Sequence, residues 1–171
     1  ALRSVTTGFG NIGIGRYAGS ALGTDQYTVA IGSSAAQDAT TSASVLIGQN
    51  AGYSLTGDEN VGVGKSALYN AGSAHSNVAV GKDAAFALST GERNVVVGHE
   101  AAKNANTMNY STVIGNNAGT MLSGSESVVI IGRNAGYYVS GSYNTFVGTN
   151  ASLGAATLTH AGRASVERKR V

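Results

Sequence analysis

Three stretches of the sequence decide its fold: Asn-Val-Gly-Val-Gly-Lys-Ser-Ala (60–67), Asn-Val-Ala-Val-Gly-Lys-Asp-Ala (77–84) and Asn-Val-Val-Val-Gly-His-Glu-Ala (94–101). Each contains a short apolar run, then a glycine, then an alanine three residues later. The pattern continues in both directions along the chain with gaps of 16 or 17 residues between its glycines, which are Gly15, Gly32, Gly48, Gly64, Gly81, Gly98, Gly115, Gly132 and Gly148. Copies in one register indicate a repeat architecture, in which each unit packs against its neighbours.

Each repeat unit combines strand residues with turn residues. Val and Ile dominate the positions before the glycine, and a short run of β-branched residues predicts a β-strand. The glycine predicts a turn that needs a positive φ or a close backbone approach. The sequence has no proline, which central strands exclude, and units of 16–17 residues are too short for two helices. We therefore expect an all-β fold, a β-solenoid or β-roll of about nine coils of 16–17 residues.

The repeat also sets the organisation of the chain. Residues 10–157 form the repeat domain, residues 1–9 are a lead-in, and residues 158–171 are a basic C-terminal tail that lacks the glycine–alanine register. An asparagine opens several units. We expect Asn60, Asn77 and Asn94 to stack as a hydrogen-bonded ladder from coil to coil.

The strand runs are apolar on both faces. We expect the residues one and three before each glycine to point into a thin core, and the residue between them to point outward. That middle residue is never polar or charged: it is Gly13, Ala30, Leu46, Gly62, Ala79, Val96, Val113, Ile130 or Phe146. A strand that is apolar on both faces is buried on both faces. Because cyclic oligomers turn one face of each subunit toward a shared axis, we expect a parallel homotrimer.

The composition excludes several classes of function. There is no cysteine for a disulfide framework, and three histidines with nine carboxylates over 171 residues give few ligands, so we expect no metal and no cofactor. No apolar run approaches about 18 residues, and we expect no membrane insertion. The net charge of +2 comes from the tail: residues 1–162 hold seven basic and eight acidic residues, residues 163–171 four and one. We therefore expect no nucleic-acid partner.

The repeat units resemble those of a known class of fibrous proteins. Asn-Val-Gly-Val-Gly (60–64), Asn-Val-Ala-Val-Gly (77–81), Asn-Val-Val-Val-Gly (94–98) and Asn-Thr-Phe-Val-Gly (144–148), each with alanine three residues later, resemble the N-x-x-[VI]-G-x-x-A repeat of trimeric bacteriophage tail fibres. They are also similar to the head repeats of YadA-like trimeric autotransporter adhesins. The resemblance covers residues 10–157.

The resemblance implies a structural or receptor-binding segment of a trimeric phage tail fibre, located in the virion and used in host-surface attachment. Implied partners are further copies of the chain, a host glycan or protein receptor, and other fibre or baseplate proteins. No chemistry of its own is implied, so the chain is not expected to be an enzyme. Two alternatives stay open: the head of a bacterial adhesin at the cell surface, and, from another class, a tailspike polysaccharide depolymerase.

The tail carries a second resemblance. Residues 161–171 resemble the start of the intramolecular chaperone domain of many phage fibres, which opens S-D-x-R-x-K and cleaves itself before its serine. Ser165 and Arg168 match, whereas Val166 and Arg170 replace the Asp and the Lys. The resemblance makes Ser165 a candidate autocleavage position at the start of a truncated downstream segment. An ordinary basic tail is the alternative.

Aromatic residues are the best candidates for recognition. Five residues after the glycine, consecutive coils carry Tyr53, Tyr69 and Phe86, and Tyr137 occupies the same column further along. We expect the three side chains of consecutive coils to stack as a ladder along one edge, and exposed aromatic strips bind sugars or protein loops. Packing between subunits or across the roll is the alternative for the same residues.

The acidic residues give no catalytic pair. A glycosidase needs two carboxylates at a fixed separation in a cleft. Asp58 and Glu59 are adjacent and should diverge in a loop, and Asp25, the nearest acid in their column, lies two coils away. The three histidines occupy different columns of the repeat. We expect no catalytic residues here and no metal cluster within one chain.

Overall fold

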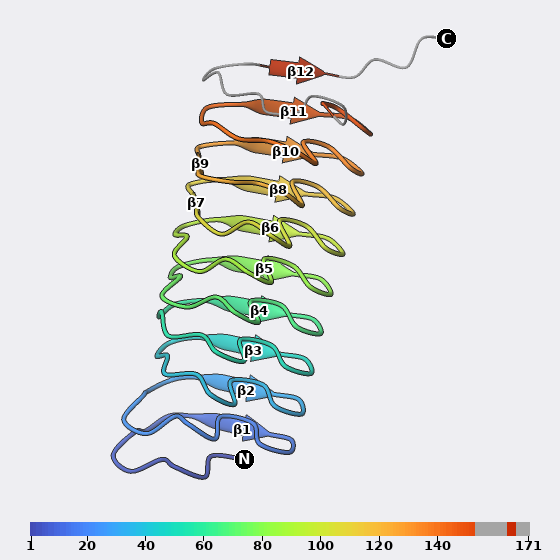
Figure 1. Ribbon diagram of the computed structural model, residues 1–171. Helices are drawn as coiled ribbons and strands as arrows, with labels where there is room; N and C mark the ends of the chain where they lie inside the picture. The colour runs from blue at the N-terminus through green and yellow to red at the C-terminus, as the bar shows by residue number, and fades with distance from the viewer. Residues whose placement is uncertain (153–163, 167–171) are drawn as a thin grey trace.

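The computed structural model describes residues 1–152 and 164–166, and that part of the chain is all-β without a helix. Nine three-residue strands stack in parallel, each directly before a repeat glycine (Figure 1). They are β1 (Ile12–Ile14), β2 (Val29–Ile31), β3 (Val45–Ile47), β4 (Val61–Val63), β5 (Val78–Val80), β6 (Val95–Val97), β8 (Thr112–Ile114), β10 (Val129–Ile131) and β11 (Thr145–Val147). The expected all-β parallel solenoid is confirmed, with about eight turns.

Two smaller features complete the strand inventory. β12 (Ala164–Val166) pairs with β11 and gives the sheet its tenth strand, with Ser165 opposite Phe146 in the backbone register. β7 (Met108–Asn109) and β9 (Ser125–Glu126) pair as a small second sheet in the closing loops. Of the predicted tail, residues 158–163 and 167–171 lie outside the described residues.

The first nine residues run beside the first coil. The Leu2 N–H donates to the carbonyl of Ala18 at 2.8 Å, and the Thr6 N–H donates to the carbonyl of Gly23 at 2.9 Å. The Leu2 side chain also lies where a Cβ on Gly13 would fall, 2.7 Å from that point. The lead-in therefore covers the N-terminal end of the coil core.

The repeat glycines combine a positive φ with a close approach between coils. Their φ angles lie between 123° and 138°. A Cβ built on Gly15 would stand 2.7 Å from the carbonyl carbon of Gly32, and one on Gly32 would stand 2.6 Å from the carbonyl oxygen of Gly48. Real Cβ atoms do not approach backbone so closely, so the turns can stack at the sheet spacing only without side chains.

The core lies on the other side of each strand from the one we expected. The middle strand residues Ala30, Leu46, Val96 and Phe146 are fully buried inside the single chain, whereas the first and third residues of each strand stay half-exposed or exposed. The predicted orientation is therefore wrong. A three-residue strand has one side chain on one face and two on the other, and this narrow coil has room for one large strand residue per turn.

Opposite the strands runs a segment that we call the return arm, residues four to seven after each repeat glycine. Its first and last residues point into the core, and their sizes compensate those of the middle strand residues. A Cβ on Gly52 would lie 2.6 Å from the side chain of Leu46, whereas Gly62, which has no side chain, faces Leu68. The same compensation pairs Val113 with Gly119 and Ile130 with Gly136. In these coils a large middle strand residue therefore goes with a glycine at the start of the return arm, and the reverse also occurs.

The expected asparagine ladder is present and buried. The Asn77 Nδ2 donates to the Oδ1 of Asn60 at 3.2 Å, and the Asn94 Nδ2 donates to the Oδ1 of Asn77 at 2.9 Å. The same oxygens accept backbone N–H groups of the next coil, and the Asn77 amide also donates to the carbonyl of Gly91. All three side chains are at most 1% exposed, and these bonds satisfy polar groups that would otherwise be costly to bury.

Candidate functional site: an apolar strand face between two charged edges

The outward side of the parallel sheet has a nearly uniform composition along the described stack. We call it the strand face and define it as the first and third residues of the nine strands β1–β6, β8, β10 and β11. Val or Ile occupies sixteen of these eighteen positions, and Thr112 and Thr145 occupy the other two. None is charged. The strand face is therefore an uncharged and predominantly apolar surface along the stack.

The strand face is accessible and large. Ile47, Val95 and Ile131 expose 36%, 39% and 38% of their surface, although each lies in the middle of a sheet. With parallel strands about 4.8 Å apart, nine strands extend for about 40 Å, and with a width of about 10 Å the face covers roughly 400 Å² in projection. Patches of this size on a soluble protein are often functional, because exposed apolar surface of this extent is unfavourable in water.

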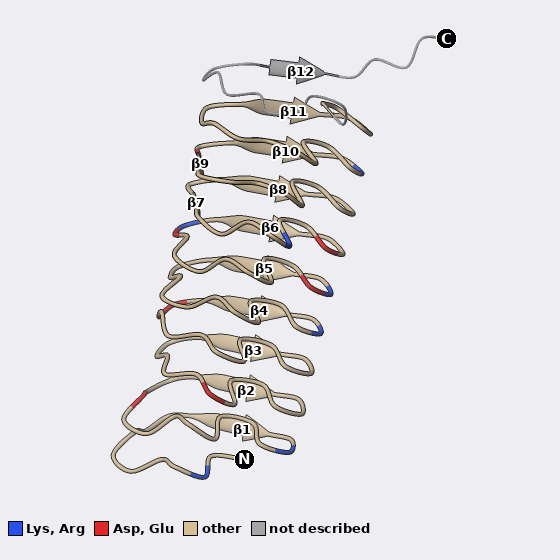
Figure 2. Cartoon of the chain, viewed as in Figure 1, with Lys and Arg blue, Asp and Glu red and all other residues tan. Residues whose placement is uncertain are grey.

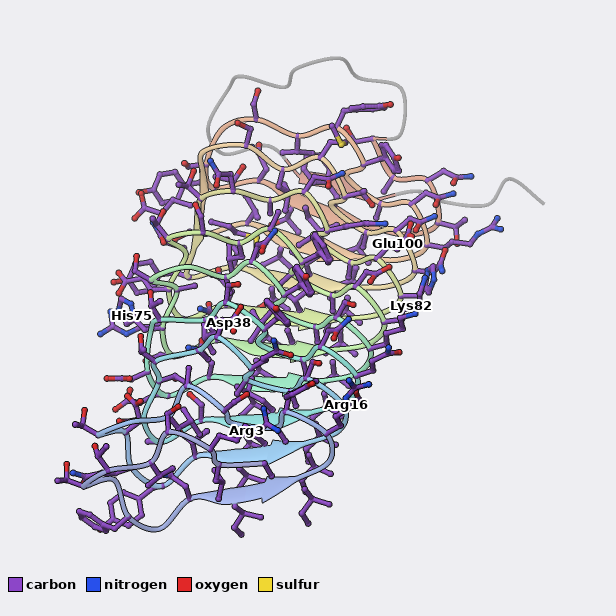
Figure 3. All side chains as sticks on the ribbon, turned by 60° about the horizontal axis from the view of Figure 1, so that its bottom comes forward. Arg3, Arg16, Asp38, His75, Lys82 and Glu100 are labelled. Atoms are coloured by element: carbon purple, nitrogen blue, oxygen red, sulfur yellow. The ribbon has the colours of Figure 1, made fainter. Side chains whose placement is uncertain are left out.

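Two edges flank the strand face, and they carry opposite charges (Figure 2). The turn edge consists of the first two residues after each repeat glycine and holds Arg16, Lys65, Lys82 and Arg133, together with Asp83 and Glu100. The loop edge consists of the closing loops before the strands and holds five acids, with Arg93 as its basic residue: Asp25, Asp58, Glu59, Glu92 and Glu126. Figure 3 places Arg16, Lys82 and Glu100 on one side of the stack and His75 on the opposite side.

The acids on the turn edge are neutralised within the chain. The Lys103 Nζ contacts the Oε1 of Glu100 at 2.9 Å and the Oδ2 of Asp83 at 3.7 Å, and the Lys82 Nζ contacts Asp83 at 3.2 Å. The hydrogen bond from Lys103 lowers the pKa of Glu100, and the same bond raises the pKa of Lys103. The uncompensated charge of this edge is therefore positive.

On the loop edge, one cluster is internally paired and the other acids are not. Glu92 accepts a hydrogen bond from the Tyr110 hydroxyl at 2.8 Å, which lowers its pKa, and it also contacts His75 at 2.9 Å and Arg93 at 3.4 Å. In the described residues, the remaining four acids of this edge form no ion pair. Burial raises the pKa of Asp25, and the negative charge of Asp58 adds to this effect.

The predicted aromatic ladder exists on the return arm. The rings of Tyr53 and Tyr69 stack with centroids 5.0 Å apart and planes at 15°, and those of Tyr69 and Phe86 stack at 4.9 Å and 1°. Tyr137 is not part of it: Lys103 and Thr120 occupy the intervening column positions, and Tyr137 packs edge-on against Tyr138 at 4.7 Å.

The stacking determines what the ladder can present to a ligand. Both faces of the Tyr69 ring are covered by its neighbours, so the ladder offers ring edges and hydroxyls outward. The Tyr53 hydroxyl accepts a hydrogen bond from the Gln37 Nε2 at 3.2 Å, and its own hydrogen bond with Asp38 raises its pKa. The rings therefore join successive coils within one chain, as a ladder does, and a receptor-binding role for them stays a prediction.

The adjacent acids Asp58 and Glu59 each have a partner inside the chain. The Asp58 Oδ1 accepts the backbone N–H of Ser42 at 2.7 Å, and the Glu59 Oε2 accepts the hydroxyl of Ser76 at 2.9 Å. A shallow hollow beside them is lined also by His75.

Among the residues that the structure describes, no three histidine or acidic side chains cluster as metal ligands, and no helix has the length and apolar character to cross a bilayer.

The strand face was not predicted from the sequence, because its positions had been expected to point into the core. The signal that could have found them is the size compensation between columns. Gly62 goes with Leu68, and Leu46 goes with Gly52, which marks the middle strand residue and the start of the return arm as neighbours. The two other strand residues must then face outward, because side chains alternate along a strand.

Comparisons with known proteins add no relative to these observations. A scan against protein-family models found no match, and searches of curated proteins and of solved structures found none either.

Proposed function

We propose that this chain is a structural and receptor-binding segment of a trimeric bacteriophage tail fibre, which assembles through its strand face. The observation that carries the proposal is the strand face itself, eighteen outward positions without a charge. Covering this surface with further copies of the chain removes apolar area from water, which is the main favourable term in protein association. The similarity of the repeat to trimeric fibres sets the expected copy number at three.

A trimer of this kind would suit attachment to a host surface. With the three strand faces turned to a common axis, the return arms and their polar side chains lie on the outside. Each binding contact is then present three times along a rigid shaft, and multivalency raises a weak affinity. The partners in this proposal are a host glycan or protein receptor and the neighbouring fibre or baseplate proteins of the virion.

The proposal assigns no catalytic step to the chain. The alternative of a depolymerase requires two cooperating carboxylates. Asp58 and Glu59, the adjacent pair, are engaged with serines of neighbouring loops. This engagement supports the choice of a binding role over a cleaving one.

Two measurements test the proposal. Sedimentation equilibrium should give three times the chain mass of 17.1 kDa, and a monomer at micromolar concentration would contradict it. Incubation with bacterial capsule or lipopolysaccharide preparations should release no oligosaccharide when the products are separated by size. Release of oligosaccharides that stops on Asp58→Asn or Glu59→Gln would replace the binding role with the depolymerase alternative.

A further inference from the structure

We infer that the two charged edges are complementary contacts between copies, such that the acidic loop edge of one copy meets the basic turn edge of the next and fixes a parallel orientation. This inference rests on the proposed self-association and names the residues that direct it. The strand face explains why copies associate, but an apolar stripe alone does not specify which way the partner runs.

Uncompensated positive and negative charges lie on separate edges of the chain. In the described residues, Arg16, Lys65 and Arg133 of the turn edge form no ion pair, and their side chains are exposed. The same holds for the acids of the loop edge other than Glu92: Asp58, Glu59 and Glu126 are exposed, and Asp25 is half-buried. The unpaired charges of the turn edge are thus all positive, and those of the loop edge are all negative.

The unpaired acids and bases also lie at matching levels along the stack. Glu59 precedes β4 and Lys65 follows it, so the two belong to the same coil on opposite edges. Glu126 and Arg133 flank β10 in the same way. At the N-terminal end, Arg16 follows β1 and Asp25 precedes β2, which places them within about one strand spacing of 4.8 Å. Every level with an unpaired acid therefore has a base at the same or the adjacent coil.

The symmetry of the assembly determines which edges meet, and the charges on those edges then favour parallel or antiparallel copies. Rotation about an axis parallel to the stack brings the loop edge of one copy beside the turn edge of its neighbour at the same height. Acids and bases then meet at each corner of a cyclic assembly. Rotation about an axis across the stack gives antiparallel copies and brings loop edge against loop edge. Like charges across an interface are strongly unfavourable, whereas complementary charges set specificity and register.

A charge-swap experiment on the full chain tests the inference. The turn-edge variant carries Lys65→Glu and Arg133→Glu, the loop-edge variant carries Glu59→Lys and Glu126→Lys, and the full swap carries all four. We expect the concentration at which the trimer dissociates to be about tenfold higher for each single-edge variant than for the wild type. In the full swap, this concentration should return toward the wild-type value. Raising the ionic strength from about 0.05 M to about 0.5 M should reduce these differences, because salt screens exposed charges.

Controls separate folding from association. A return-arm variant with Asn70→Glu and Asn104→Glu adds charge away from both edges and should assemble like the wild type. Far-ultraviolet circular dichroism checks that each variant keeps its β structure. The inference would be overturned if the wild type is a trimer and both single-edge variants dissociate at the same concentration as it does. It would also be overturned if the full swap assembles no better than the single-edge variants. Either result would leave the strand-face proposal intact. A monomeric wild type would instead overturn the proposed function.

Discussion

The strand face and the outer side of the return arm belong to the same coils and cover the same core, yet their compositions differ. The strand face holds Val or Ile at sixteen of eighteen positions. The outward columns of the return arm hold residues as different as Gln37, Asp38, Tyr69, Asn70 and Lys103. Packing on the core therefore does not dictate what points outward.

Strand propensity alone does not account for the difference either. Thr is β-branched and favours strands about as well as Val, and it would be the natural choice for a face in contact with water. It occurs at only two positions, Thr112 and Thr145. The scarcity of polar residues and the lack of charged ones on the strand face thus point to a requirement from outside the coil, which is why we place the copy-to-copy contact there.

The largest expected effect comes from the turn that joins the two regions. Gly81→Ala should lower the free energy of unfolding by about 3–5 kcal/mol, because it adds strain at a φ of 135° and a clash with the Gly98 backbone. Gly124→Ala is the matched control: its φ is 58°, but nothing lies within 4 Å of the added Cβ. Its cost should stay near 1 kcal/mol. Urea unfolding at a fixed protein concentration measures both, and equal costs would show that stacking of the turns does not matter.

A smaller effect is expected from the ladder at the entrance to the strands. Asn77→Ala should cost about 2–3 kcal/mol, because it leaves the Asn94 amide and the Asn94 backbone N–H without the Oδ1 acceptor at a buried position. Asn70→Ala, at an exposed position on the return arm, should cost less than about 0.5 kcal/mol. Thermal unfolding of both variants gives the comparison, and similar midpoints would contradict the stabilising role of the ladder.

The return arm gives a still smaller effect that should leave assembly untouched. Tyr69→Ala removes two stacked contacts and should cost about 1–2 kcal/mol without a change in the oligomeric mass. Tyr137→Ala removes one edge-on contact and should cost less. A loss of trimer on Tyr69→Ala would place a copy-to-copy contact on the return arm and reverse the comparison between the two regions.

The smallest effect concerns acid. The pKa of Glu92 is lowered in the folded chain, first by the hydrogen bond from Tyr110. A carboxyl with a depressed pKa stabilises the fold above its unfolded pKa of about 4.3, and this contribution disappears as the pH falls through the folded pKa. The difference in stability between the wild type and Glu92→Gln should therefore shrink below about pH 4. A stability difference between the two proteins that grows as the pH falls would contradict a lowered pKa for Glu92.

The repeat made the fold predictable from the sequence, and it did so for a physical reason. Glycine is needed at one point of every coil, where a positive φ and a close approach coincide, so the nine glycines reveal the coil length. The ladder of Asn60, Asn77 and Asn94 was predictable for a similar reason, because a ladder needs the same residue type at the same position of successive coils. The three stacked rings of the return arm were also predictable, because a column of the repeat becomes a row in space.

The direction in which the strands face was not predictable from alternation. Val61, Gly62 and Val63 are all apolar, so a period of two carries no information on which of them points inward. Likewise, the charges on the two edges were visible as columns, with Glu59 before β4 and Lys65 after it, but only the fold shows that the apolar face between them is exposed. Side-chain direction and edge position are properties of the closed coil and are not encoded locally.

The oligomeric mass of one pair of variants tests the central claim most directly. Val80→Asp places a charge in the strand face, and Asn70→Asp places the same charge on the return arm. Native mass spectrometry should find the wild type and Asn70→Asp at three times 17.1 kDa and Val80→Asp as a folded monomer. A trimer that tolerates Val80→Asp, or a wild type that is itself a monomer, would contradict assembly through the strand face.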